Sequence, residues 1–365
     1  LIDLAQDQNY TLQIAGLKVL EAQAQLGIVT GLQYPQQQQV DGGIARVSPS
    51  ENAGGGSQSF NSYDLGVSIA WELDFWGKYR NGIESADAFL QATVANYDEA
   101  VILLTASVAS AYATARILEE QLRIAHQNLE LQRRSYDIAE VLFRNGQNSE
   151  LDKQQALTLL LSTRATVPAL ETGVRLARNA LSNLLSQPPT YVDALLGEGQ
   201  IPKVPDAVSV GIPADLVRRR PDVRSAEMLA VAQNAAVGGA TADLYPSIAL
   251  GGSFGLSSIS SSVGGGGAGD FFDGDSFTWN AGVGINWPFL NYGRIRNNIR
   301  VQDARLQQSL IAYQNTVLNA VREVDDSIVS LNGCSDTISD TPTLFVTCSM
   351  TTGRRISVGM PATAV

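Results

Sequence analysis

Few residues in this sequence could carry out catalytic or ligand chemistry, and they are scattered along it. His126 is the only histidine, and it stands in a helical pattern with no nucleophile or second base near it in the sequence. A packed or surface histidine is therefore favoured over a catalytic one. The two cysteines, Cys334 and Cys348, have neither a metal-ligand spacing nor a disulfide framework around them. These residue types predict no enzyme, no metal site and no bound cofactor.

One pair of carboxylates and one glycine-rich run could be interpreted as a catalytic pair and a phosphate-binding loop, but the neighbouring sequence does not favour either interpretation. Glu72 and Asp74 fall on one face of a predicted strand, as the carboxylate pair of a glycosidase could. Their position on the polar face of an alternating strand favours contact with water instead. The run Gly264–Gly267 lacks the Lys-Ser/Thr that follows in a phosphate-binding loop. It is interpreted, like Gly54–Ser57, as a flexible connection between strands.

The charge of the chain limits its partners. With 25 Lys+Arg against 36 Asp+Glu the net charge is −11, which excludes a nucleic-acid partner because phosphate backbones are bound by basic surfaces. The one compact basic run, Arg218–Arg220, precedes Pro221 and Asp222, a pattern typical of a loop entering a helix. Because no uninterrupted stretch of 18 apolar residues occurs, no membrane-spanning helix is predicted.

Two segments of the chain alternate between apolar and polar or small residues, as strands with one apolar and one wet face do. These patterns predict two strand pairs, at about 34–48 with 63–75 and at about 245–258 with 277–290. The apolar-face residues are Leu65, Val67, Ile69, Trp71, Val283, Ile285 and Trp287. The wet-face residues are Asp64, Ser68, Glu72, Asn280 and Asn286.

The two strand pairs belong to an internal duplication. Gly66-Val67, Ile69 and Trp71 recur 216 positions later as Gly282-Val283, Ile285 and Trp287, and Tyr34-Pro35 recurs 211 positions later as Tyr245-Pro246. The chain is therefore divided into a first repeat at 1–190, a linker at 191–213, a second repeat at 214–332 and a tail at 333–365. Each repeat opens with a helix and continues with a strand pair.

A helix of unusual length follows the first strand pair. From Ile83 to Asn145, 63 residues contain neither glycine nor proline, which corresponds to roughly 90 Å of helix. Gly146 suits the left-handed position just past a helix end, and Ser149 with Asp152 suits a capping box that opens a returning helix. A helical hairpin is therefore predicted over 78–187. Its tip consists of Arg144, Asn145, Gly146, Gln147, Asn148 and Ser149.

The second repeat begins in the same way, with a helix predicted over 294–332, and then departs from the pattern. From Gly333 onward the helical period disappears, and the tip of a second hairpin would fall at 360–365, where the sequence stops. The returning arm of that hairpin is expected to be missing. Any export signal or lipid anchor is expected to precede Leu1.

Three motifs of the chain carry a resemblance to a known family. They are Trp71-Glu72-Leu73-Asp74-Phe75-Trp76-Gly77-Lys78, Tyr245-Pro246-Ser247-Ile248, and Ile212-Pro213-Ala214-Asp215-Leu216-Val217-Arg218-Arg219-Arg220-Pro221-Asp222-Val223-Arg224-Ser225-Ala226-Glu227. These motifs resemble those of the outer-membrane efflux factors, a TolC-like family, in the lipoprotein branch that serves RND-type multidrug pumps. The resemblance covers about residues 1–332.

The resemblance implies a mixed fold of long α-helical hairpins, which form a periplasmic tunnel, and four strands. Three chains would join their strands in one twelve-stranded outer-membrane β-barrel. The apolar strand residues would then face lipid and the polar ones the lumen, and the tip at 144–149 would dock a periplasmic adaptor that works with an inner-membrane RND-type pump.

The expected function is a passive exit duct for drugs or other small molecules in a tripartite efflux system, with no enzymatic activity. Two ducts of the same class remain alternatives, one for type I protein secretion and one for metal-ion efflux. A soluble coiled-coil scaffold is the alternative from another class, since the long alanine-rich helix alone would suffice for it.

Overall fold

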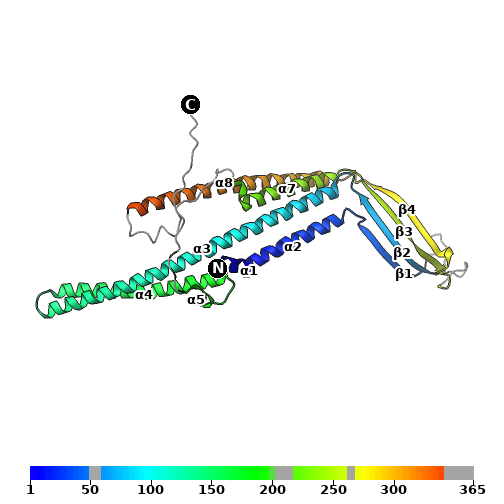
Figure 1. Ribbon diagram of the computed structural model, residues 1–365. Helices are drawn as coiled ribbons and strands as arrows, with labels where there is room; N and C mark the ends of the chain where they lie inside the picture. Colours follow the sequence, from blue (N-terminus) through cyan, green and yellow to red (C-terminus); the bar gives the residue numbers. More distant parts are fainter. Residues whose placement is uncertain (49–58, 198, 200, 202–216, 261–267, 341–365) are drawn as a thin grey trace, which may run out of the picture. The chain divides into compact units, whose positions relative to one another are not determined.

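The computed structural model is mostly helical, with one antiparallel sheet of four strands (Figure 1). It describes residues 1–48, 59–197, 199, 201, 217–260 and 268–340, and of 331–340 the backbone alone. The predicted glycine loops at 54–57 and 264–267, most of the linker and the tail from 341 lie outside the described residues. The helices are α1 (Ile2–Gln8), α2 (Tyr10–Gly31), α3 (Lys78–Arg144), α4 (Glu150–Leu184), α5 (Tyr191–Leu196), α7 (Pro221–Ala242) and α8 (Arg294–Asp340).

Two helix limits differ from those expected. The first helix is divided at Asn9, whose side-chain oxygen accepts a hydrogen bond from Leu12 N at 3.0 Å and whose amide donates to Leu184 O at 2.8 Å. Asn9 therefore caps α2, as asparagine commonly does. The helix expected over 294–332 is corrected to α8, which continues through Gly333 to Asp340. A single glycine lowers helix stability by about 1 kcal/mol but does not end a helix without a competing cap.

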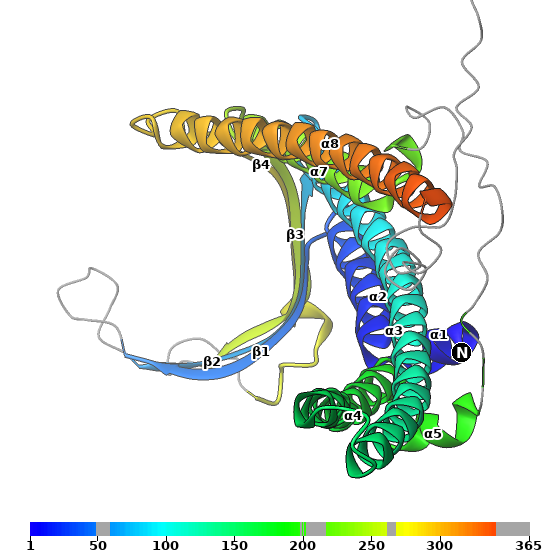
Figure 2. The ribbon, with the colours of Figure 1, turned by 90° about the vertical axis from the view of Figure 1, so that its left-hand side faces the viewer.

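The four strands form one sheet in the order β1-β2-β3-β4, with every neighbouring pair antiparallel. Their bounds are β1 (Gln37–Val47), β2 (Phe60–Leu73), β3 (Ser247–Ser260) and β4 (Phe277–Asn286). β4 ends before Trp287 because Pro288 has no N–H for the ladder and restricts the residue before it. Trp287, expected within the strand, therefore lies just beyond it. Figure 2 shows that the sheet is strongly curved.

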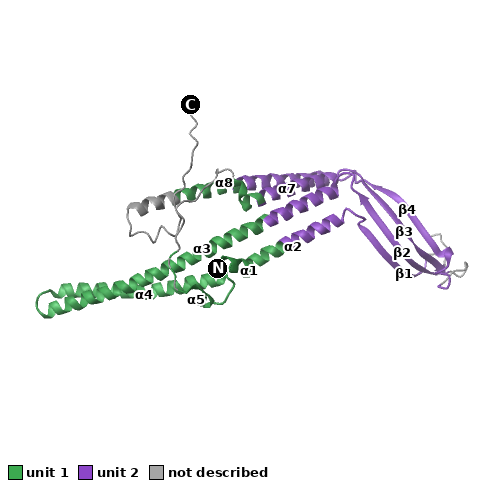
Figure 3. Ribbon diagram, in the orientation of Figure 1, with its two compact units in different colours: residues 1–18, 95–224, 316–365 green, residues 19–94, 225–315 purple. Residues whose placement is uncertain are grey.

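The described chain falls into two compact units, each built from both sequence repeats (Figure 3). One unit holds Leu1–Lys18, Ala95–Arg224 and Thr316–Val365, and the other holds Val19–Val94 and Ser225–Asn315. In the first unit α4 runs back along α3 (Figure 1). The apolar core there consists of Ala5, Leu12, Leu104, Val108, Leu181, Leu185, Val192 and Leu196.

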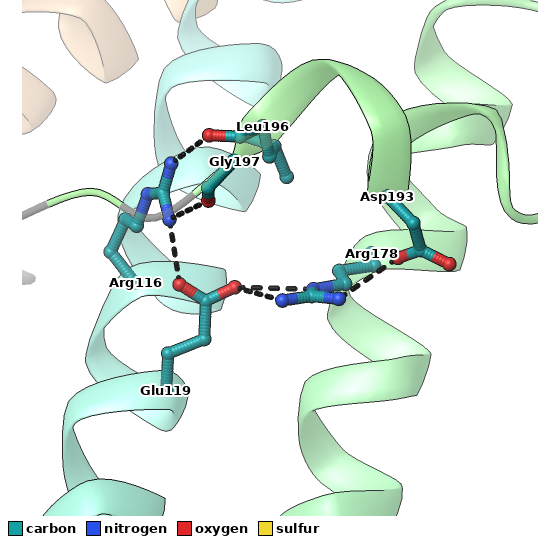
Figure 4. A network of polar contacts seen from close by, with 6 residues as sticks. All are labelled: Arg116, Glu119, Arg178, Asp193, Leu196 and Gly197. Carbon is teal, nitrogen blue, oxygen red and sulfur yellow. Dashed lines mark hydrogen bonds and ion pairs between the residues drawn. The ribbon is translucent and has the colours of Figure 1, made fainter.

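An ion-pair network fixes the short helix α5 to the hairpin in the same unit (Figure 4). The Arg116 guanidinium donates to Leu196 O at 2.6 Å and to Gly197 O at 3.0 Å, at the C-terminus of α5. Glu119 accepts from Arg116 at 2.8 Å and from Arg178 at 2.8 Å, and Arg178 also donates to Asp193. Two arginines thus connect α3, α4 and α5.

By length and composition alone, α3 is the one described helix that could cross a membrane. Its most apolar window of 18 residues has a mean hydropathy of 1.6 and is 22% buried. This is weak evidence for a span, since an apolar helix that packs against neighbouring helices in an assembly has the same composition.

Candidate membrane sheet and hairpin tip

The sheet separates apolar from polar side chains across its whole width. Because directly paired residues share a face, the pairs Val40 with Val67, Val67 with Phe254 and Phe254 with Trp279 place one apolar row across all four strands. The apolar residues predicted on this face lie on it, except that Trp287 follows the end of β4. Most of them are exposed in the single chain, with 66% of Val283 and 71% of Ile285 accessible, while Val67 and Trp71 are half-buried. An exposed apolar surface of this extent requires a non-aqueous environment or a partner.

The opposite face carries small and polar side chains. Hydrogen bonds tie it together: Ser257 donates to Asp64 at 2.7 Å, Ser68 to Asp41 at 3.2 Å, and the Asn280 amide to Ser253 Oγ at 2.6 Å. The register puts all five predicted wet-face residues, Asp64, Ser68, Glu72, Asn280 and Asn286, on this side. The structure therefore brings together the two predicted sets as two opposite faces.

Glycines on both faces of the sheet allow the strands to come close together and curve. A Cβ on Gly255 would lie 2.5 Å from Gly66 Cα in the neighbouring strand, and one on Gly252 would lie 3.1 Å from Asn280 O. Glycine in a strand marks such close backbone approach and sharp bending. The curvature in Figure 2 thus has a direct cause in the sequence.

Aromatic residues mark both ends of the sheet. At the end nearer the helices the indole N–H groups of Trp71, Trp76 and Trp287 donate to the carbonyls of Gln33, Pro246 and Leu244 at 3.0, 2.8 and 3.1 Å. At the far end Phe277 and Trp279 are 56% and 69% exposed. Aromatic rows of this kind flank the apolar band of membrane β-barrels, where their rings lie at the level of the lipid headgroups.

The six predicted tip residues form a tight connection between α3 and α4. Gly146 has φ +70°, and the N–H groups of Gly146 and Gln147 donate to Phe143 O and Leu142 O, both at 2.9 Å. This is a Schellman motif. Ser149 and Asp152 then form the expected capping box. Every residue from Arg144 to Ser149 is exposed, so the tip combines an ordered backbone with side chains that a partner could reach.

Charges next to the tip tie the two arms together. Glu140 accepts hydrogen bonds from Lys153 at 3.3 Å and from Arg144 at 3.1 Å, and these two cations lower the pKa of its carboxyl group. Lys153 also lies 5.6 Å from the centre of the Phe143 ring. Arg144 is thus engaged within the tip, whereas Gln147 and Asn148 remain available.

Sequence reasoning missed two groups of residues. Arg116 and Arg178 are engaged by carbonyls and carboxylates distant in sequence, which no local pattern shows. The contact between Trp76 and Tyr245, whose rings stack at 4.6 Å, joins the two repeats. The duplication had marked both residues, because Trp76 and Tyr245 belong to segments that occur in both repeats. The repeat alone did not show that these two segments are in contact.

The structure places the single histidine on a helix surface and the last arginine of the basic run in an ion pair. His126 lies exposed on α3. Arg220 precedes Pro221, the first residue of α7, and binds Asp222 at 2.8 Å and Glu323 at 2.7 Å. Among the described residues no cluster of three or more histidine, cysteine, aspartate or glutamate side chains could hold a metal ion.

Comparisons of the sequence and of the structure with known proteins all lead to one family. Nodulation protein T of Rhizobium leguminosarum bv. viciae is 34% identical over 277 residues, which make up 75% of this chain and 55% of that protein. Cation efflux system protein CusC of Escherichia coli O157:H7 is 32% identical over 343 residues, 93% of this chain and 71% of that protein. The solved structure of the outer-membrane channel OprN is 29% identical with a TM-score of 0.86, and covers 93% of this chain and 74% of that chain.

The chain therefore spans about half the length of Nodulation protein T and most of CusC. The OprN similarity shows the TolC-like fold of long helices with a four-stranded contribution to a sheet, and places it in the outer membrane. Residues 1–187 and 212–340 match the family described as outer membrane efflux protein. On this match, the chain belongs to the outer membrane efflux protein family.

Proposed function

We propose that this chain is one protomer of a trimeric exit duct in the outer membrane, the last component of a tripartite efflux system. In this role it conducts small molecules passively, and it carries out no chemical reaction. The observation that carries the proposal is the sheet of four strands with a continuous apolar face on one side and a small, polar face on the other.

The sheet favours assembly with further copies of the same chain. Four strands are too few to close a membrane barrel, for which eight is the usual minimum. An open sheet edge in lipid would leave backbone N–H and C=O groups unpaired, which hydrocarbon does not tolerate. β1 and β4 are the outer strands of the described sheet, so β4 of one copy would pair with β1 of the next. Three copies would close a barrel of twelve strands.

In such a barrel the two faces have distinct environments. Leu65, Val67, Ile69, Trp71, Val283, Ile285 and Trp287 face lipid, while Asp64, Ser68, Glu72, Asn280 and Asn286 line the water-filled lumen. The small residues of the polar face keep the lumen wide. Glu72 accepts a hydrogen bond from the Tyr79 hydroxyl at 3.1 Å, and Asp74 lies 3.6 Å from the Arg80 guanidinium. Both carboxylates are thus paired where β2 leads into α3, and they are not proposed as a catalytic pair.

The hairpin tip is the proposed docking site for a periplasmic adaptor. Its backbone is held by the Schellman motif and the capping box, so the exposed Gln147 and Asn148 are presented without a large ordering cost. An inner-membrane pump of the RND type would deliver the cargo through that adaptor.

The class of cargo stays open between drugs, metal ions and secreted proteins. CusC is named for cation efflux, whereas Nodulation protein T is named for nodulation, so the relatives do not agree on one. The soluble coiled-coil scaffold is disfavoured by the family match and by the sheet.

The proposal is tested by fractionation and mass. Full-length protein is expected in the outer-membrane fraction, to be released only by detergent, and to have the mass of three chains in native mass spectrometry. In planar bilayers it should support ion conductance. A water-soluble monomer in the periplasmic fraction would contradict the proposal.

A further inference from the structure

The junction between helix and strand is built twice in this chain, with the same hydrogen bonds. α2 and α7 have equal lengths of 22 residues, with every position of α7 lying 211 after its counterpart in α2. Thr30 Oγ1 donates to Leu26 O and Thr241 Oγ1 to Val237 O, both at 2.8 Å. After the strands the offset is 216, and there Gly77 and Gly293 have φ +76° and +82°. The two repeats are therefore equivalent in structure as well as in sequence.

Within the chain, the segment that joins β2 to α3 in the first repeat packs on the segment that joins α7 to β3 in the second. The Trp76 ring stacks on Tyr245 with 4.6 Å between centroids and an interplanar angle of 18°. Its indole N–H donates to Pro246 O at 2.8 Å. Beside this stack the Asn81 side chain fills the space above Gly238, where an added Cβ would lie 2.7 Å from Asn81 Oδ1. In this contact, residues at the start of α3 pack against residues at the end of α7.

The equivalent residues at the start of α8 and the end of α2 make no such contact with the described residues of the single chain. Tyr292, which corresponds to Trp76, is 96% exposed, and Tyr34, which corresponds to Tyr245, is 64% exposed. Gly27, which corresponds to Gly238, has no described atom within 4 Å of an added Cβ. Asn297, which corresponds to Asn81, is exposed. Two surfaces are thus left exposed: one at the start of α8, with Tyr292 and Asn297, and one at the end of α2, with Tyr34 and Gly27.

We propose that these two surfaces meet between neighbouring copies of the chain. Tyr292 of one copy stacks on Tyr34 of the next, its hydroxyl donates to Pro35 O, and Asn297 occupies the space above Gly27. Each copy uses a different surface toward each neighbour, so the contact is heterologous and continues until the ring closes. This inference rests on the proposed trimer and assigns residues to its interface.

The contact between copies lacks an ion pair that the contact within a chain has. Lys78 forms an ion pair with Asp243 at 3.2 Å beside the Trp76 stack. Their counterparts are Arg294 and Leu32, which cannot pair. The interface between copies is therefore aromatic and close-packed, and its strength should depend little on salt.

Crosslinking of cysteines tests the contact directly. In a background with Cys334→Ser and Cys348→Ser, the double variant Tyr34→Cys with Tyr292→Cys is treated in membranes with a short bifunctional thiol reagent. Denaturing gels are expected to show covalent dimers and trimers. Either single variant should remain monomeric, because a heterologous contact never brings two copies of one residue together. Co-expressed single variants should yield dimers and no trimers.

The outcomes separate this inference from the proposed function. A trimeric wild-type protein with an uncrosslinked, still trimeric double variant would overturn the tyrosine contact and leave the exit duct intact. Loss of the trimer in the double variant, with unchanged helix content by circular dichroism, would support the contact, because both tyrosines are exposed in the single chain. A monomeric wild-type protein would overturn both.

The two glycines give a second test with a matched control. Gly27→Phe should leave the single chain folded, because the space above Gly27 is open, yet it should reduce trimer yield at least tenfold. Gly27→Ala, also too large for Asn297 to approach closely, should show a smaller loss. Gly238→Phe should instead reduce the yield of folded chain, since the Asn81 side chain occupies the space that the phenylalanine ring would need. Normal trimer yield in Gly27→Phe would overturn the proposed packing.

Discussion

Arg116 is a charged residue in an almost fully buried position, with 3% of its surface exposed. Its guanidinium binds two carbonyls at the end of α5 and the carboxylate of Glu119, and its planar fork suits such simultaneous contacts. One nitrogen, Nε, has no partner among the described groups. The residue thus holds α5 through polar contacts in a place where burial alone would penalise a cation.

Replacing Arg116 should therefore be costly. In Arg116→Leu the carbonyls of Leu196 and Gly197 lose their donor and Glu119 loses one of its two arginines. We expect a loss of about 3–5 kcal/mol in the free energy of unfolding, as for other broken buried ion pairs. Urea denaturation of the detergent-solubilised protein measures it. Arg123→Leu is the control, because Arg123 is exposed and pairs within α3 with Glu120; equal effects of both variants would contradict the role given to Arg116.

The ion pair at the start of α7 should give stability a defined pH dependence. The hydrogen bond from Arg220 lowers the pKa of Asp222, so the unfolded chain binds a proton to this group at a higher pH than the folded chain does. Its contribution is therefore full above an ordinary aspartate pKa of about 4 and is lost as the pH falls through the lowered value. Burial raises the pKa of the neighbouring Glu99, which contributes with the opposite sign.

Comparison of variants isolates the aspartate. The difference in unfolding free energy between wild type and Asp222→Asn should be largest from about pH 5 upward and should shrink as the pH falls below about 4. Glu99 is present in both proteins, so the part of its raised pKa that burial causes cancels in the comparison, whereas the smaller part that the charge of Asp222 causes does not. A difference that is constant from pH 3 to pH 7 would show that the carboxylate of Asp222 gives no charge-dependent stability.

At the scale of elements, the strands show what local patterns can and cannot predict. The alternation of Val67, Ser68 and Ile69 predicted both faces of the sheet, because side chains in any strand point alternately to opposite sides. It did not predict that β4 ends at Asn286, where Pro288 interrupts the ladder. The hairpin tip was equally predictable, because a helix end depends on residues within one turn of it.

The two faces should respond differently to an added charge. Val67→Arg or Ile69→Arg places a cation on the apolar face, which should impair assembly by about 2–4 kcal/mol near the middle of the bilayer. Ser68→Arg, one residue away on the polar face, should be far milder because its side chain reaches water. Yield of detergent-resistant oligomer and its melting temperature measure the difference. Equal losses on both faces would reject the assignment of lipid and lumen.

At the scale of the whole molecule, contacts between segments distant in the chain are what the sequence left open. Arg116 and Leu196 are 80 positions apart and Arg220 and Glu323 are 103 apart, and no periodicity links such pairs. The duplication is the exception, because it relates distant segments by a constant offset. Through it, the contact of Trp76 with Tyr245 points to a partner for the exposed Tyr292 in a neighbouring copy of the chain.

The tip of the hairpin is where the assembled molecule should meet its adaptor, and two kinds of variant separate docking from folding. Changing Gln147 and Asn148 to glutamate alters only exposed side chains, so the trimer and its melting temperature should stay unchanged. Crosslinking to the adaptor and export of drugs should be lost, because two added charges disturb a surface that must fit another protein.

Gly146→Val is the contrasting variant. A β-branched residue at the φ of +70° observed for Gly146 is strained by roughly 1–2 kcal/mol, although no neighbouring atom blocks its side chain. This variant should lower the melting temperature as well as export. If the Gln147/Asn148 variant exports normally while Gly146→Val does not, the tip is a structural turn and docking takes place elsewhere. Loss of export in the first variant with an unchanged melting temperature assigns docking to the tip itself.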